Sequence, residues 1–113
     1  MHEVGIMQEA LRMALETAQS SKATRIHEVR LRVGAMSGVV PDALRFAFDV
    51  LCRDTIAAGA RLEIEAVPAT CWCAACKTEF VCEDYVNACP RCSQLSGDLR
   101  RGRELELAAV DMS

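Results

Sequence analysis

Two short cysteine pairs constrain this chain more than any other feature of its sequence. Each pair has the spacing C-x-x-C, and twelve residues separate the pairs. The four cysteines are Cys73, Cys76, Cys89 and Cys92. A C-x-x-C turn folds back on itself and can place two sulfurs on one metal ion, so two such turns supply four thiolates in a tetrahedral arrangement. We therefore predict a structural zinc site without an open coordination position.

Other chemistries are compatible with the same four positions. A rubredoxin-like site would bind iron, and unligated pairs would work as redox-active dithiols. The further thiols Cys71 and Cys82 slightly favour the redox interpretation, and Cys71 is close enough in sequence to the first pair to replace one of its ligands. Cys52 falls on the apolar face of a predicted helix, where we expect it in the core. Seven cysteines, an odd number, fit ligands and buried thiols better than a disulfide framework.

The residues that follow each pair are unusual for turns of this kind. Such turns often carry a glycine directly after the second cysteine, which eases the turn that points backbone amides at sulfur. Lys77 and Ser93 occupy those two places. We expect the difference to affect the geometry of the turns and not the identity of the ligands.

Composition limits the core and the kinds of partner. A chain of 113 residues has the usual size of one domain, and folding buries roughly two thirds of its unfolded surface. Only 4% of the residues are aromatic, so we expect an aliphatic core with Phe46, Phe48 and Phe80 among its few large side chains. The formal charge of -3 argues against a nucleic-acid partner, because proteins that follow a phosphate backbone are normally basic.

The sequence also bears on where the protein is found. It has no run of about 18 apolar residues that would span a bilayer. A signal peptide is not expected either, because His2 and Glu3 stand where a positively charged region would be. We therefore expect a cytoplasmic protein without a membrane partner.

Two periodicities predict an α+β fold. Apolar residues recur at spacings of three and four over residues 4–18 and again over 44–51, which predicts two helices that each bury one face. Apolar and polar residues alternate over 28–33, 61–67 and 104–110, which predicts three strands. We therefore predict a small three-stranded sheet packed with two helices.

The cysteine-rich segment interrupts this regular pattern. Periodicity is lost in this segment, and six of the seven cysteines gather there. We expect residues 70–102 to form a zinc-ribbon module inserted before the last strand. Residues 1–69 together with 103–113 would then form the α/β domain.

The first three residues, Met1-His2-Glu3, offer a second metal-binding chemistry. Initiator methionine is normally trimmed only before a small residue, so we expect the amine of Met1 to stay next to His2. This amine, the backbone nitrogens of His2 and Glu3 and the His2 imidazole can place four nitrogens in one plane, which suits Ni(II) or Cu(II) and not zinc. The alternative is an exposed histidine followed by a first-turn acid that complements the helix dipole. The tripeptide alone leaves both interpretations open.

The order of these features resembles a known family along essentially the whole chain. The opening Met1-His2-Glu3, the helix after it, the segment 46–49, the two cysteine pairs and the closing segment 102–105 resemble the HypA/HybF family of hydrogenase maturation proteins. The resemblance implies a nickel metallochaperone and not an enzyme. It also implies a small nickel-binding α/β domain with an inserted zinc ribbon, which helps to load Ni(II) into the large subunit of NiFe-hydrogenase.

The resemblance also implies roles for particular residues and partners. His2 would be the essential nickel ligand, with the Met1 amine and the Glu3 backbone as co-ligands. The four paired cysteines would hold structural Zn(II), and Ni(II) would be the transferred cargo. The implied partners are HypB, a companion nickel GTPase, and the immature hydrogenase large subunit, and some members of the family also support urease maturation.

Two rival functions use the same sequence differently. A zinc-ribbon adaptor or nucleic-acid-binding module would use Arg100, Arg101 and Arg103 as its contact patch, although the acidic total argues against a broad phosphate footprint. An iron electron carrier would use the four cysteines alone and would be coloured when purified. We find neither a nucleophile triad nor a phosphate-binding glycine loop in the sequence, so we expect no enzymatic activity.

Overall fold

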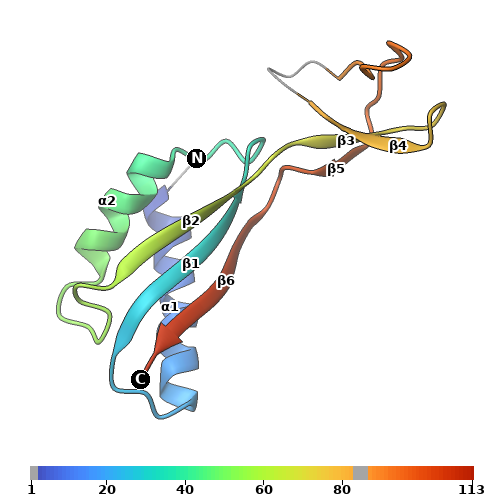
Figure 1. Cartoon of the computed structure of the whole chain (residues 1–113). Helices are drawn as coiled ribbons and strands as arrows, with labels where there is room; N and C mark the ends of the chain where they lie inside the picture. Colours follow the sequence, from blue (N-terminus) through green and yellow to red (C-terminus); the bar gives the residue numbers. More distant parts are fainter. Residues whose placement is uncertain (1–2, 83–86) are drawn as a thin grey trace. The chain divides into compact units, whose positions relative to one another are not determined.

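The computed structural model describes residues 3–82 and 87–113. Two α-helices and six β-strands make up this part of the chain (Figure 1). They are α1 (Glu3–Ser20), β1 (Ile26–Gly34), α2 (Pro41–Leu51), β2 (Arg61–Val67), β3 (Thr70–Cys73), β4 (Thr78–Val81), β5 (Leu99–Arg101) and β6 (Leu105–Met112). The predicted α+β class is confirmed, since the two helices accompany one three-stranded sheet and a second small sheet carries the cysteine pairs.

The first sheet has the strand order β2-β1-β6, and the colours of Figure 1 show β1 and β2 running in the same direction. Near the start of both strands, Arg61 forms an ion pair with Glu28 at 2.8 Å. Further along both, Arg32 lies 3.6 Å from Glu65. Parallel neighbours need a crossover connection, usually a helix, and α2 provides it between β1 and β2.

Strand β6 lies on the other side of β1 and runs antiparallel to it in Figure 1, so the sheet is mixed. The amide of Gly34, at the end of β1, donates a hydrogen bond to the carbonyl oxygen of Glu104 at 2.7 Å. At the opposite end, the amide of Ser113 donates to the carbonyl oxygen of Arg25 at 3.0 Å. The chain therefore returns to the first sheet only after the cysteine-rich segment.

Both helices cover one face of this sheet (Figure 1). The alternate residues Val29, Leu31 and Val33 of β1 are buried. Helices α1 and α2 also contact each other, and their buried side chains are Met7, Ala10, Leu11, Ala14, Ala18, Leu44, Ala47 and Phe48. The expectation that Phe46 belongs to the core is wrong: its side chain is 73% exposed, because the buried stripe of α2 runs through Leu44, Ala47 and Phe48.

The second sheet has the strand order β4-β3-β5, with β3 antiparallel to both neighbours. Cys71 lies opposite Phe80, and Cys73 lies opposite Thr78. The sequence did not predict these three strands, because each has only three or four residues. The chain divides into two compact units: residues 1–32, 38–65 and 106–113 form the first, and 33–37 with 66–105 form the second.

One close approach inside the second unit requires glycine. A Cβ atom on Gly34 would lie 2.2 Å from the carbonyl carbon and oxygen of Gly102. Gly102 itself has φ of +120°, and a Cβ there would lie 2.7 Å from the Cα of Ala69. Such distances are not tolerated by real side chains, so two backbone segments far apart in sequence meet here at glycines.

Candidate metal centre

The small second sheet and two tight turns position the four paired cysteines. Cys73 is the last residue of β3, and Cys76 lies in the turn that leads to β4. Cys89 and Cys92 flank a second turn, in which the amide of Ser93 donates to the carbonyl oxygen of Cys89 at 2.8 Å. Each ligand pair is therefore held by its own turn.

The four sulfur atoms converge on one point. All of them lie within 4.8 Å of one another. Two distances join the turns: the Cys73 and Cys92 sulfurs are 3.5 Å apart, and the Cys76 and Cys89 sulfurs are 4.0 Å apart. A zinc–sulfur bond of about 2.3 Å in a tetrahedron gives sulfur–sulfur distances of about 3.8 Å. The two observed distances lie on either side of this value, so the residues fit one tetrahedral zinc ion.

Both turns use a left-handed residue where glycine is usual. Lys77 has φ of 52° and Ser93 has φ of 65°. In the first turn, the amide of Cys76 donates to the sulfur of Cys73 at 3.5 Å. The expected effect of the missing glycines on turn geometry is therefore small in the first turn, which still directs a backbone amide at a sulfur.

Hydrogen bonds and neighbouring sulfurs shift the acidity of these thiols in opposite directions. The backbone amide of Arg91 is the main reason that the pKa of Cys89 is lowered to about 7, with a second amide from Cys92. The pKa of Cys76 is raised to about 12, chiefly by its contact with the Cys92 sulfur. Four neighbouring thiols cannot all ionise alone, and a bound cation supplies the charge that lets them do so.

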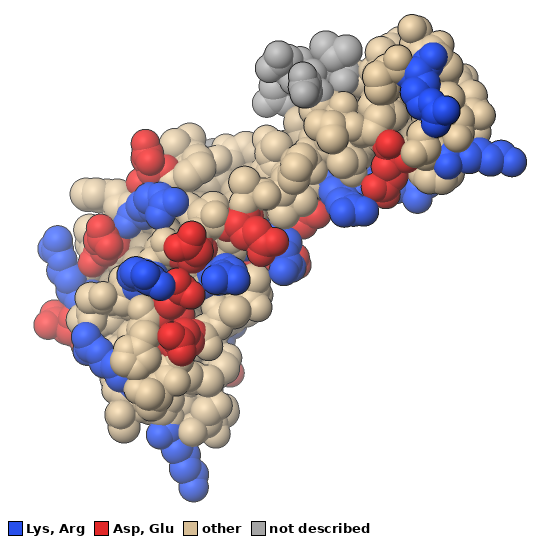
Figure 2. Space-filling model, in the orientation of Figure 1, with Lys and Arg blue, Asp and Glu red and all other residues tan. Residues whose placement is uncertain are grey.

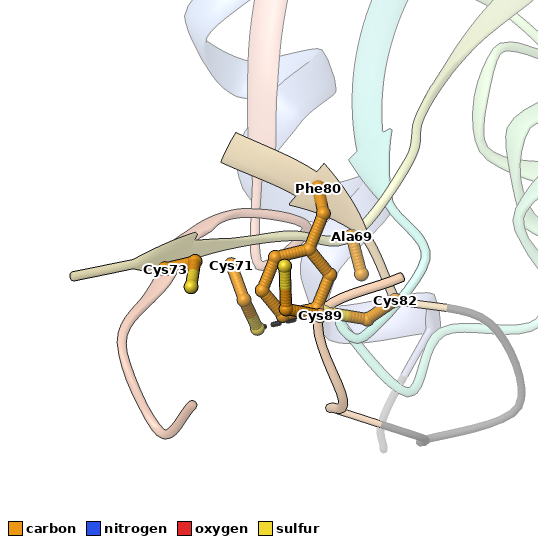
Figure 3. Close-up of a cluster of buried hydrophobic side chains, with 6 residues drawn as sticks. All are labelled: Ala69, Cys71, Cys73, Phe80, Cys82 and Cys89. Carbon is orange, nitrogen blue, oxygen red and sulfur yellow. Dashed lines mark hydrogen bonds between the residues drawn. The ribbon is translucent and has the colours of Figure 1, made fainter. Parts of the chain in front are cut away.

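Two of the four sulfurs also belong to the apolar core of the second unit. The core consists of Ala69, Cys71, Cys73, Phe80, Cys82 and Cys89, all buried (Figure 3). Cys76 is half-buried and Cys92 is exposed. A core with one aromatic ring and otherwise small side chains buries little apolar area, so we attribute much of the unit's stability to its metal.

The remaining thiols lie outside this group of four. The sulfur of Cys71 contacts that of Cys82 at 2.7 Å. Cys52 is buried in the first unit, as the sequence predicts, and burial raises its pKa to about 11. We looked in residues 3–82 and 87–113 for places where three or more metal-ligating side chains converge. The group found there consists of the four paired cysteines.

The predicted nickel ligands Met1 and His2 lie outside the described residues. Glu3 is the first residue of α1 and stands in its first turn. The described part of the chain therefore opens with a helix of 18 residues.

The arginines of the rival nucleic-acid interpretation are largely engaged by nearby carboxylates. Arg100 pairs with Asp98 at 2.9 Å and lies over the ring of Trp72 at 4.9 Å. Arg101 pairs with Glu79 at 3.1 Å. On the face drawn in Figure 2, basic and acidic side chains of the described residues are interspersed. This mixed surface is unlike a continuous phosphate-binding stripe.

The two helices of the described residues lack the length and apolar character needed to cross a bilayer. The fold and the four-sulfur centre define a small α+β metal-binding protein with a zinc-ribbon-like second sheet. A family model described as "Hydrogenase/urease nickel incorporation, metallochaperone, hypA" matches residues 1–112.

Individual relatives agree with this match. The chain is 45% identical to the hydrogenase maturation factor HypA of Picosynechococcus sp. over 99% of both chains. It is 41% identical to the same factor of Chloroflexus aurantiacus over 98% of both. The solution structure of the nickel metallochaperone HypA from Helicobacter pylori covers 99% of this chain and 97% of its own, with a TM-score of 0.67 at 22% identity, and shows the likeness in fold.

The chain belongs to the HypA family of nickel metallochaperones for hydrogenase maturation. The family predicted from the sequence is confirmed, and so is its non-enzymatic character, because metallochaperones carry a metal ion and do not transform a substrate.

Proposed function

We propose that this protein carries exchangeable Ni(II) at its first three residues and keeps Zn(II) at its four paired cysteines. In this proposal the His2 side chain binds nickel together with the Met1 amine and the backbone nitrogens of His2 and Glu3. The observation that supports this proposal is the four-sulfur centre, in which protein sulfurs would fill every coordination position. A tetrahedral thiolate site suits zinc and leaves no position for a transient ion, so a nickel metallochaperone of this family needs a separate nickel site.

The zinc centre has a structural role in this proposal. Bound zinc supplies a fixed cross-link between the two turns and no reactive water, because all four positions belong to protein sulfur. The predicted zinc-ribbon domain, residues 70–102, would then depend on the ion for its fold. The predicted α/β domain, residues 1–69 with 103–113, would fold without it.

A terminal chelate suits delivery because it is exposed and can be dismantled by a partner with better ligands. We propose a cytoplasmic exchange in which a HypB-type GTPase hands over or accepts nickel and the immature large subunit of NiFe-hydrogenase receives it. Urease maturation proteins are an alternative destination, since the family description names urease as well. Nucleotide hydrolysis belongs to the GTPase in this scheme.

The nickel site is tested by titrating Ni(II) into zinc-loaded protein with its native terminus. We expect His2→Ala, and a version extended before Met1, each to lose the absorption band of planar nickel and most of the calorimetric binding signal. His27→Ala is the matched control, because His27 is the other histidine of the chain and is exposed, with its Nε2 2.7 Å from the Ser113 hydroxyl oxygen. This control should bind nickel like the parent protein.

Equal nickel binding by the parent, His2→Ala and the extended version would refute the terminal chelate. Loss of binding in His27→Ala alone would move the site to the first sheet. Zinc content, measured by mass spectrometry of the intact protein, should stay the same in every variant, because the cysteines are untouched.

A further inference from the structure

Cys71 and Cys82 form a sulfur–sulfur contact that zinc binding does not explain. The two sulfurs lie 2.7 Å apart, and the residues are only 1% and 8% exposed (Figure 3). Neither belongs to the group of four converging ligands. A covalent disulfide has a sulfur–sulfur distance of about 2.05 Å, so a short movement separates this contact from a bond.

The backbone around both thiols is held in place by the second sheet. Cys71 lies in the middle of the β3–β4 ladder, opposite Phe80. Cys82 follows β4, and its amide donates to the carbonyl oxygen of Ala69 at 2.9 Å, which extends the same ladder. The two cysteines thus stand on one face of the hairpin as diagonal neighbours, and their sulfur contact at 2.7 Å shows that the two short side chains meet.

We propose that Cys71 and Cys82 are a redox-active dithiol that closes into an intramolecular disulfide while the zinc ligands remain thiolates. The oxidant is a low-molecular-weight disulfide. Burial raises the pKa of the Cys82 thiol to about 11, so this thiol gives up its proton as it attacks one sulfur of the small disulfide, and the proton passes to the sulfur that leaves. The Cys71 sulfur then attacks the Cys82 sulfur, and its proton passes to the second departing thiol. The protein pair loses two electrons and two protons, and the small disulfide is reduced to two thiols.

Proximity favours this bond over the competing products. The second step joins two sulfurs already in contact, so it has the high effective concentration of an oriented intramolecular reaction. The four ligand sulfurs would have to leave zinc before forming disulfides. Cys52 is a buried free thiol of the first unit.

The new bond would enclose part of the metal centre. It would join β3 to the residue after β4, and the loop between them carries Cys73 and Cys76. The hairpin that presents these two ligands would then be covalently closed, so we expect zinc to leave the oxidised protein more slowly than the reduced protein.

The test uses the full-length, zinc-loaded protein in glutathione buffers of increasing oxidised fraction. Samples are quenched in acid, alkylated in denaturant and digested with trypsin without reductant. Lys77 lies between the two cysteines, so trypsin places them in separate peptides, 62–77 and 78–91. We expect a cross-linked peptide pair that lacks two hydrogen atoms, with fragment ions that assign the bond to Cys71 and Cys82. One zinc per chain should remain.

Three variants and a denatured sample make the outcome decisive. Cys71→Ser and Cys82→Ser should each abolish the cross-link, and Cys52→Ser should leave it unchanged. Denatured parent protein shows which buffers are able to oxidise the thiols. The proposal is overturned if the folded pair stays reduced in those buffers, or if the first disulfides join zinc ligands and zinc is lost.

Discussion

Lys77 and Ser93 hold a backbone conformation that glycine adopts more readily. Their φ values are 52° and 65°, and both side chains are exposed, so shortening them removes no core packing. An L-residue in the left-handed region is disfavoured by roughly 1–2 kcal/mol. Substitution by glycine removes this cost, but about 0.5–1 kcal/mol of the gain is lost because glycine has greater conformational freedom in the unfolded chain. We expect Lys77→Gly and Ser93→Gly each to stabilise the zinc-bound unit by about 0.5–1 kcal/mol.

This stabilisation should be measurable as zinc affinity, because folding and metal binding are coupled in small metal-organised units. A gain of about 0.5–1 kcal/mol corresponds to roughly two- to fivefold tighter binding for each substitution. Ser93→Gly is the cleaner variant, since it changes no charge. Lys77→Gly also removes a cation near the thiolates and should fall at the low end of the range.

The assay is an equilibrium competition for zinc between the full-length protein and a chromophoric chelator. Lys22→Gly and Asp54→Gly are matched controls, because these residues have φ of 59° and 61° but lie in the first unit. They should raise resistance to urea and leave zinc affinity unchanged. If Ser93→Gly binds zinc no more tightly than the parent, or if the controls tighten zinc equally, the backbone argument is refuted.

Two further predictions concern the thiolates. Cys73→Ala should lose zinc and the hydrogen-exchange protection of the second sheet while the helical circular dichroism of α1 and α2 persists; full zinc retention would identify Cys71 as a replacement ligand. Acid should release zinc, because protons compete for sulfur. Cys89 has a pKa of about 7 without metal, so it is ionised before zinc binds above that pH and protonated below it. The slope of log affinity against pH should therefore rise by about one proton per zinc as pH falls through 7, and a constant slope would contradict this.

The long, periodic elements of the fold could be predicted from the sequence, and the short ones could not. Helix α1 and strand β2 carry seven or more residues of regular pattern, enough for the buried face to stand out. Strand β3 has only four residues, and its two inward positions, Cys71 and Cys73, are cysteines. A cysteine in a sequence is first interpreted as a possible metal ligand. Here Cys71 and Cys73 are buried like small apolar residues, so they also form the inward face of a strand.

In the candidate metal centre too, some features could be predicted from the sequence and others could not. Sequence spacing predicts which four cysteines act together, since a C-x-x-C turn restricts the chain locally. The contact between Cys71 and Cys82 depends on the register of β3 against β4, and no local pattern specifies that register. The left-handed backbone at Lys77 was not predictable from residue type, because the demand of the turn overrides the preference of lysine.

Two of the four converging cysteines, Cys73 and Cys89, also fill the core of the second unit. With zinc bound as proposed, such a unit would have little left to hold it together once the ion is gone, so metal loss and unfolding would become one event. The unfolded segment would present Lys77 and Arg91 to proteases, whose cleavage follows the population of the open state. Zinc supply would then set how long each molecule survives, and copies that lost zinc would be removed before they could meet a nickel enzyme.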